Sequence, residues 1–94
     1  MQRSIIEQEV KRRIDIAVWA YAYEVMDAPL VDDSVFDLEC MFVDLTVRTG
    51  NVVMDTFFEQ EFNPSTGLWI LKHPNIEGVK RIYKIKLDSH KNSY

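Results

Sequence analysis

The sequence predicts a mainly α-helical domain built on a hairpin of two helices. Hydrophobic residues recur at helical spacing on both sides of a short Asp-Ala-Pro segment, which is the pattern of an αα-hairpin. The chain has 94 residues, of which 47% are hydrophobic and 12% aromatic, a composition that suits a globular domain and argues against disorder. We therefore expect one domain over residues 1–94, with the hairpin in 4–50, a less regular part in 51–88 and a frayed tail in 89–94.

The first helix is predicted over residues 4–26. Ser4 and Glu7 form a capping-box pair, in which the serine hydroxyl accepts from an amide of the first turn and the glutamate reaches back. The hydrophobic residues that follow keep helical spacing: Ile6, Val10, Ile14, Ala17, Val18, Tyr21 and Val25. Pro29 marks the end of this helix, because the residue before a proline is driven out of the α region.

The second helix is predicted to begin at Asp32 or Asp33, since either aspartate can cap it, and to end at Gly50. Its inward stripe is predicted to consist of hydrophobic residues at helical spacing: Val35, Phe36, Leu38, Met41, Phe42 and Leu45. The Pro-containing turn between the two helices is short, and it brings the end of the first helix close to the start of the second.

The C-terminal half is predicted in less detail. Residues 51–62 indicate a short helix that packs Val52, Val53, Phe57 and Phe58, and residues 63–67 (NPSTG) form a turn. The apolar run at 68–72 is either a short strand or an extended plug of the core. Residues 76–87 keep helical spacing, although 83–87 also alternate like a strand, and we favour a helix there.

The net charge of −4 is unevenly distributed along the chain. Residues 24–61 hold ten acidic side chains against one base, Arg48, whereas 77–94 hold five bases against two acids. One interpretation is solvated helix faces; the other is docking onto a charged partner or self-association. Direct DNA binding is disfavoured, because the acidic middle repels phosphate.

Motifs for catalysis or metal binding are missing from the sequence. It has no Gly-rich phosphate loop, no HExxH and no Cys/His metal spacing. The single cysteine, Cys40, excludes an internal disulfide and lies in a hydrophobic part of the second helix, which favours a buried thiol over a nucleophile. We expect no metal and no catalytic activity. Without a signal peptide or an apolar run of membrane-spanning length, a cytoplasmic location is expected.

The mouth of the hairpin gathers side chains suited to a flat, cationic ligand. Tyr23 and Glu24 lie in the last turn of the first helix, and Asp33, Phe36 and Asp37 lie in the first turns of the second. Aromatic faces stack on an electron-poor ring, and carboxylates accept hydrogen bonds from ribose hydroxyls or an amide. A purely structural interpretation is also open, in which Asp33 caps a helix and the aromatic residues belong to the core.

The segment YAYEVMDAPLVDDSVFDLECMF resembles the N-terminal Ia domain of NAD-dependent DNA ligases. That family carries Tyr-x-Tyr-(His)-x-x-Asp-x-Pro-x-x-x-Asp-x-x-Tyr-Asp-x-Leu across such a helical hairpin. The matching positions in this chain are Tyr21, Tyr23, Asp27, Pro29, Asp33 and Asp37. The resemblance covers residues 14–45, and the turn at 63–67 is similar to the Ser-Pro-Thr segment that leads toward the ligase catalytic domain.

The resemblance implies a site for nicotinamide mononucleotide (NMN) or for that half of NAD. It assigns nicotinamide stacking to Tyr23, ribose or phosphate recognition to Asp33 and Asp37, and positioning to Phe36, with Tyr21 and Glu24 at neighbouring motif positions. Two residues depart from the family: Glu24 stands in place of histidine, and Phe36 in place of tyrosine. Each lost polar contact costs about 1–3 kcal/mol when its partner is left unpaired.

Two functions of different classes follow from these features. The first is a non-catalytic module that recognises NMN or NAD, in trans to a catalytic ligase subunit, since the chain lacks the family's nucleotidyltransferase lysine motif. The second is a small acidic interaction or inhibitor protein, of the kind that phages encode, which reuses the scaffold without binding nucleotide. In the first case the partner is a ligase subunit, and in the second it is another protein with a basic surface.

Overall fold

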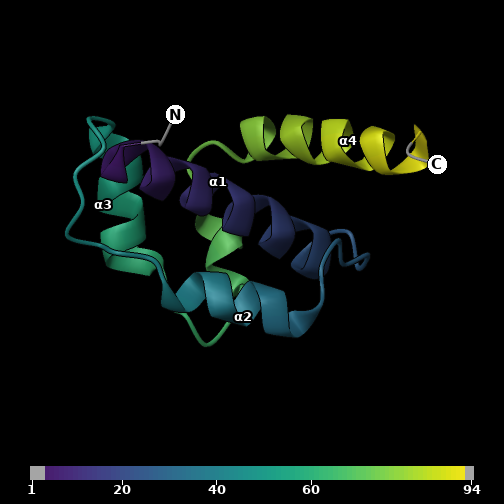
Figure 1. Cartoon of the computed structure of the whole chain (residues 1–94), viewed down its shortest axis with the longest axis horizontal. Helices are drawn as coiled ribbons and strands as arrows, with labels where there is room; N and C mark the ends of the chain where they lie inside the picture. The colour runs from purple at the N-terminus through teal and green to yellow at the C-terminus, as the bar shows by residue number, and fades with distance from the viewer. Residues whose placement is uncertain (1–3, 93–94) are drawn as a thin grey trace.

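The computed structural model describes the backbone of residues 4–92 and the side chains of residues 4–89. Its elements in chain order are α1 (Ile5–Glu24), α2 (Asp33–Met41), α3 (Val52–Glu61), the 3-10 helix η1 (Leu68–Lys72) and α4 (Ile76–Asn92). The described chain contains no strand, so the mainly α-helical class is confirmed. Helix α1 packs against α4, η1 and α2, with α4 and α2 on opposite sides of it (Figure 1).

Helix α1 follows its predicted boundaries closely. The amide of Glu7 donates to Ser4 Oγ at 3.1 Å, and this hydroxyl donates in turn to Glu7 Oε1 at 3.2 Å. After Glu24 the chain reverses at Asp27, whose φ of 52° lies in the left-handed region that aspartate tolerates. The amide of Ala28 then donates to the carbonyl of Ala22 at 2.9 Å, so the helix ends two residues earlier than predicted.

Helix α2 is shorter than predicted. It begins after Asp32 and ends at Met41, so the prediction that it continues to Gly50 is wrong. Two hydrogen bonds from side chains of α1 explain this early end. Glu9 Oε2 accepts from the amide of Asp44 at 3.2 Å, and Arg13 Nη2 donates to the carbonyl of Asp44 at 2.8 Å. These partly buried bonds hold the backbone of the following segment in a non-helical path.

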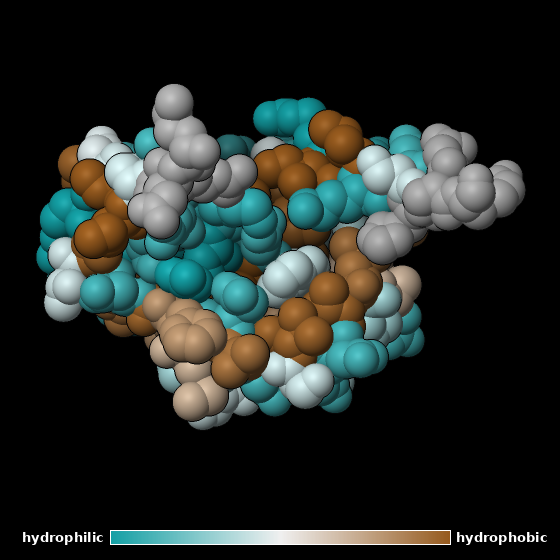
Figure 2. Space-filling model, viewed as in Figure 1, coloured by the Kyte–Doolittle hydropathy of each residue, from teal (hydrophilic) through white to brown (hydrophobic). Residues whose placement is uncertain are grey.

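The predicted inward stripe of α2 is also wrong in most of its positions. Cys40 is buried, and Phe36 packs against the core as predicted, together with Leu45 beyond the helix. The other stripe residues face solvent: Val35, Leu38, Met41 and Phe42. Since α1 is the main neighbour of α2, much of the surface of α2 is left uncovered, and hydrophobic surface remains along it on the face in view (Figure 2).

The C-terminal half contains α3, η1 and α4, of which η1 and α4 pack against α1. Helix α3 is capped by Asn51, whose Oδ1 accepts from the amide of Met54 at 3.2 Å. Phe57 and Phe58 are buried as predicted, whereas the expected packing of Val52 and Val53 is wrong, because both lie in the exposed first turn.

The apolar run at 68–72 forms the 3-10 helix η1, so the strand alternative is wrong. Trp69 and Ile70 are buried in the core, as the plug alternative expected, although the segment is helical and not extended. Trp69 Nε1 donates to the carbonyl of Thr66 at 2.7 Å.

Helix α4 confirms the helical alternative for residues 76–87 and is longer than expected. It continues through residues 88–92, which were predicted to belong largely to a frayed tail, while residues 93–94 lie outside the described chain. Val79 and Tyr83 are buried against α1, and the ring of Tyr83 stacks on Tyr21 with centroids 5.4 Å apart. Residues 76–87 form a helix and not a strand because the apolar stripe of this helix packs against α1.

A buried charge network ties α1 to α3. Arg13 Nε donates to Glu9 Oε2 at 2.8 Å, and Arg13 Nη1 donates to Asp55 Oδ1 at 3.0 Å. All three side chains are buried, and no buried side-chain polar atom among the described residues lacks a partner. Although burial acts to raise the pKa of Asp55, hydrogen bonds from Thr49, together with Arg13, hold it below its ordinary value. The loop between α2 and α3 is thereby fixed to α1.

Candidate functional site

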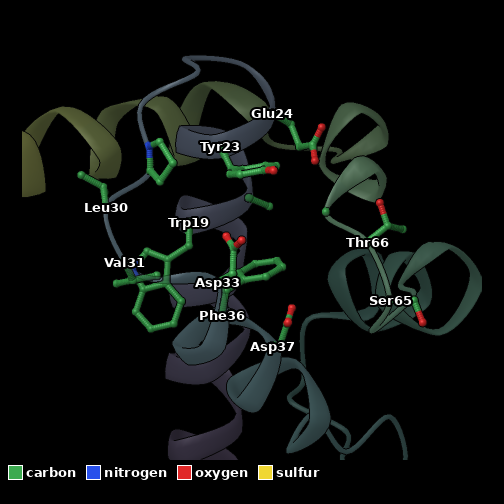
Figure 3. Close-up of a pocket in the computed structure, with 13 residues that line it drawn as sticks. Trp19, Tyr23, Glu24, Leu30, Val31, Asp33, Phe36, Asp37, Ser65 and Thr66 are labelled. Carbon is green, nitrogen blue, oxygen red and sulfur yellow. The ribbon is translucent and has the colours of Figure 1, made fainter.

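The hairpin mouth contains a cavity of about 320 Å³. It lies between the end of α1, the turn after it, the start of α2 and the segment 65–67 (Figure 3). Its lining residues are Trp19, Ala20, Tyr23, Glu24, Pro29, Leu30, Val31, Asp33, Phe36, Asp37, Ser65, Thr66 and Gly67. Two stretches far apart in the sequence, the hairpin and the Pro-Ser-Thr-Gly turn, therefore form one site.

Five of the six residues predicted to bind a nucleotide line this cavity: Tyr23, Glu24, Asp33, Phe36 and Asp37. The sixth, Tyr21, lies instead in the core, only 5% exposed and stacked on Tyr83. Two positions along an α-helix are about 200° apart around its axis, so Tyr21 and Tyr23 point to opposite faces of α1. Of the two tyrosines in the motif, Tyr21 is therefore a core residue and Tyr23 lines the cavity.

Aromatic and apolar side chains form one wall of the cavity. Tyr23 is half exposed, and Phe36 is partly buried against the core; both project into the space between α1 and α2 (Figure 3). Trp19 adds a third ring, which the sequence reasoning missed. The sequence could have predicted it, because Trp19 precedes Tyr23 by four residues and therefore lies on the same face of the helix. Leu30 and Val31 extend this wall from the turn.

The polar residues of the lining include three carboxylates as well as Ser65 and Thr66. Glu24, Asp33 and Asp37 belong to it, and no lysine, arginine or histidine does. Asp33 does not cap α2: the N-cap is Asp32, and its side chain makes no capping hydrogen bond. Within the described chain, no hydrogen bond or ion pair engages the carboxylate of Asp33 or Asp37. Asp33 thus lies in the first turn of α2, where the helix dipole favours an acid, and the structural interpretation also places Asp37 near this positive end.

The segment 65–67 closes the cavity against α1. An added Cβ on Gly67 would lie 3.4 Å from Ala20 Cβ and 3.4 Å from Glu24 Cγ, so the glycine permits a close approach to the helix. Thr66 Oγ1 accepts from the amide of Leu68 at 3.1 Å, which fixes the start of η1. Glu24 thus lies in a defined position between α1 and this segment.

Cys40 is separate from the cavity. It is buried in the core, as the sequence indicated, at 2% exposure. Burial, with smaller effects from Asp37 and Glu39, raises the pKa of its thiol to about 11. At neutral pH the thiol is protonated, and an inert packing role follows.

Three further observations bear on the class of protein. Comparison of the chain with protein-family models, with curated proteins and with solved structures found no match. In the described part of the chain, no group of three or more His, Cys, Asp or Glu side chains is arranged to hold a metal ion. None of the helices that the structure describes combines the length and hydrophobicity needed to cross a bilayer.

Proposed function

We propose that this protein is a non-catalytic module that recognises NMN, or the nicotinamide half of NAD, at the hairpin-mouth cavity. The observation that carries the proposal is the gathering of Tyr23, Asp33, Phe36 and Asp37 around one cavity, in the pattern that resembles ligase Ia domains. The adenylyl transfer of such ligases needs a lysine from another domain, so the module acts in trans to a catalytic partner. Such a partnership places the protein in the cytoplasm.

The residues present fit the nicotinamide riboside part of the ligand. The cavity volume of about 320 Å³ lies at the lower end of the usual range for ligand sites, about 300–1,000 Å³. The oxidised nicotinamide ring is flat and cationic, so Tyr23 and Phe36 offer it stacking and cation–π attraction. Ribose hydroxyls donate to carboxylates, and Asp33 and Asp37 have free acceptor oxygens for them.

The phosphate part of the ligand has no matching partner in the lining. No cationic side chain lines the cavity, and Glu24 adds a negative charge close to Gly67. We therefore assign the phosphate to the solvent side of the site, where a basic surface of the catalytic partner is available to it. This arrangement also makes binding by the isolated module weak.

The test is an amide chemical-shift titration of the purified chain with NMN and then NAD, with AMP as the control ligand. We expect saturable shifts at residues 23–24 and 33–37, with AMP silent. Tyr23→Ala and Asp33→Asn should abolish them, whereas Asp32→Asn, which changes the adjacent carboxylate outside the lining, should not. The absence of shifts at millimolar NMN, or equal binding by Asp33→Asn, would overturn the proposal.

A second function is favoured by the outer face of α2. Leu38, Met41 and Phe42 are 53%, 74% and 56% exposed, and the acids Asp33 and Asp37 lie on the same helix. Such a surface suits an interaction or inhibitor protein that docks on a basic, partly apolar surface. A lysine- and leucine-rich helical peptide is a suitable probe, and its binding should weaken steeply as salt is added. Binding that is independent of salt, or insensitive to Leu38→Ser, would exclude this alternative.

A further inference from the structure

A second cavity, of about 380 Å³, lies where α1, α3 and α4 meet. Most of its lining is apolar, including Val10, Ile14, Met54, Phe58, Val79 and Ile82. It shares no residue with the cavity at the hairpin mouth. Hydrophobic surface is visible between α1 and α4 (Figure 2). The nucleotide proposal does not use this second cavity.

Three polar residues at its edge have already used their acceptor atoms. Asn51 Oδ1 accepts from the amide of Met54 at 3.2 Å, and Asn75 Oδ1 accepts from the amide of Gly78 at 3.2 Å. His73 Nδ1 accepts from the amide of Asn75 at 3.0 Å, which places the proton of the neutral ring on Nε2. Within the described chain, neither amide nitrogen nor His73 Nε2 has a hydrogen-bond partner. The groups of these residues that have no partner are therefore hydrogen-bond donors.

The remaining polar groups of the lining are committed to the protein. Thr49 Oγ1 donates to Asp55 Oδ1 at 2.7 Å. The Arg13 guanidinium makes bonds to Glu9, to Asp55 and to two backbone carbonyls. No aspartate or glutamate lines the cavity. Burial lowers the pKa of His73, so its ring is neutral at pH 7 and adds no charge. The lining thus has no uncompensated charge to hold an ion.

We propose that this cavity binds a small, uncharged, largely apolar molecule that carries a carbonyl group as its hydrogen-bond acceptor. The apolar walls favour a hydrocarbon or aromatic body, because its burial removes apolar surface from water. The amides of Asn51 and Asn75 and the His73 Nε2–H match an acceptor, whereas a ligand that brings only donors meets acceptor atoms that already hold a hydrogen bond. A charged ligand loses hydration here without gaining a counter-charge.

Three molecules of one shape provide the test: propiophenone, propylbenzene and 1-phenylpropan-1-amine, which supply an acceptor, no polar group and an ammonium donor. In amide chemical-shift titrations of the full chain, we expect saturable shifts at residues 54, 58, 79 and 82 with the ketone. The hydrocarbon should bind about tenfold more weakly, the equivalent of one hydrogen bond, and the amine more weakly still. Failure of the ketone to saturate at millimolar concentration, or equal binding of the amine, would overturn the proposal.

Matched variants test whether Asn51 and Asn75 bind the ligand through their amide nitrogens or only stabilise the helix ends through their oxygens. Asn51→Asp and Asn75→Asp keep the oxygen that accepts the helix amide and replace the amide nitrogen with a carboxylate oxygen. We expect ketone affinity to fall at least fivefold in each variant, while propylbenzene affinity and the thermal midpoint stay near the wild-type values. An equal loss for both ligands would assign the asparagines to packing alone. Ile14→Trp should block all binding, and Leu71→Trp, at an exposed position outside both linings, should not.

Discussion

Arg13 Nη1 lies 3.0 Å from Asp55 Oδ1, and this buried contact joins α1 to the first turn of α3. The same guanidinium holds Glu9 within its own helix and the carbonyls of Asp44 and Val47 in the intervening loop. One side chain therefore organises the loop between α2 and α3, in which no apolar side chain is fully buried. Burial makes this arrangement costly to break, since the partners of a missing charge stay desolvated.

Replacing Arg13 should destabilise the protein strongly. Arg13→Met leaves Asp55 buried without its cation and Glu9 paired with Arg12 alone, and we expect a loss of about 3–5 kcal/mol in the free energy of unfolding. The control is Arg48→Met, which removes an exposed pair with Glu59 and should cost less than about 1 kcal/mol. Urea unfolding followed by circular dichroism measures both, and equal losses would contradict the role given to the network.

Stability should decline as the pH falls below about 6.5 because of His73. Burial lowers the pKa of this histidine in the folded protein below its ordinary value of 6.5. The unfolded state therefore takes up the proton first, and the stabilisation present above pH 6.5 is lost as the pH falls through the folded pKa. His73→Gln should flatten the profile in this window, measured as urea midpoints at several pH values. An unchanged slope in the variant would show that another group is responsible.

Cys40 should resist alkylation in the folded protein. A pKa of about 11 leaves roughly one thiol in a thousand ionised at pH 8, and the side chain is buried. We expect iodoacetamide to modify Cys40 at least a hundredfold faster in unfolding concentrations of urea than in buffer, as followed by intact mass. Free glutathione, alkylated in both solvents, controls for the effect of urea on the reagent. Rapid labelling of the native chain would contradict the burial of this thiol.

Tyr83 should anchor α4. Its ring is 4% exposed and stacks on Tyr21, so Tyr83→Ala should cost about 3–5 kcal/mol of stability. Ile85, on the same helix, is 65% exposed, and Ile85→Ala should change stability by less than about 0.5 kcal/mol. Thermal unfolding compares the two variants. Similar midpoints would mean that α4 contributes little to the core.

Restoring the ligase-like residues should strengthen nucleotide binding, if the proposed function is correct. Glu24→His removes a negative charge from the cavity, and Phe36→Tyr adds a hydroxyl to its aromatic wall. At about 1–3 kcal/mol for each polar contact, we expect the affinity for NMN to rise by about fivefold to a hundredfold per change. Isothermal titration measures it, with Glu7→His as a control on the same helix away from the cavity. No gain from either change would count against NMN as the ligand.

Local chemistry made much of the fold predictable. The Ser4 cap, the break at 27–29 and the helical period between them defined α1 almost to the residue, because these signals act within one or two turns. The same is true of the helical stripe at Val79 and Tyr83, which outweighed the alternating pattern that follows. Five cavity residues were predicted because a hairpin of known turn length brings its helix ends together.

Long-range contacts decided the rest. The early end of α2 depends on bonds from Glu9 and Arg13, which lie some 30 residues before the loop they hold. The faces of α2 and α3 left in solvent, including Met41 and Val52, depend on which neighbours are present to cover them. Neither effect can be predicted from nearby residues, because hydrophobic spacing identifies the apolar face of a helix but not the element that packs against it.

The sequence by itself determined the helical class, the capped and terminated first helix and the set of aromatic and acidic residues at the hairpin mouth. Only the tertiary structure decided that Tyr21 serves the core while Tyr23 serves the cavity, and that Trp19 and residues 65–67 complete the site. The physical reason is that helix periodicity defines the angle between side chains, whereas the face that turns inward is chosen by packing against α4 and η1.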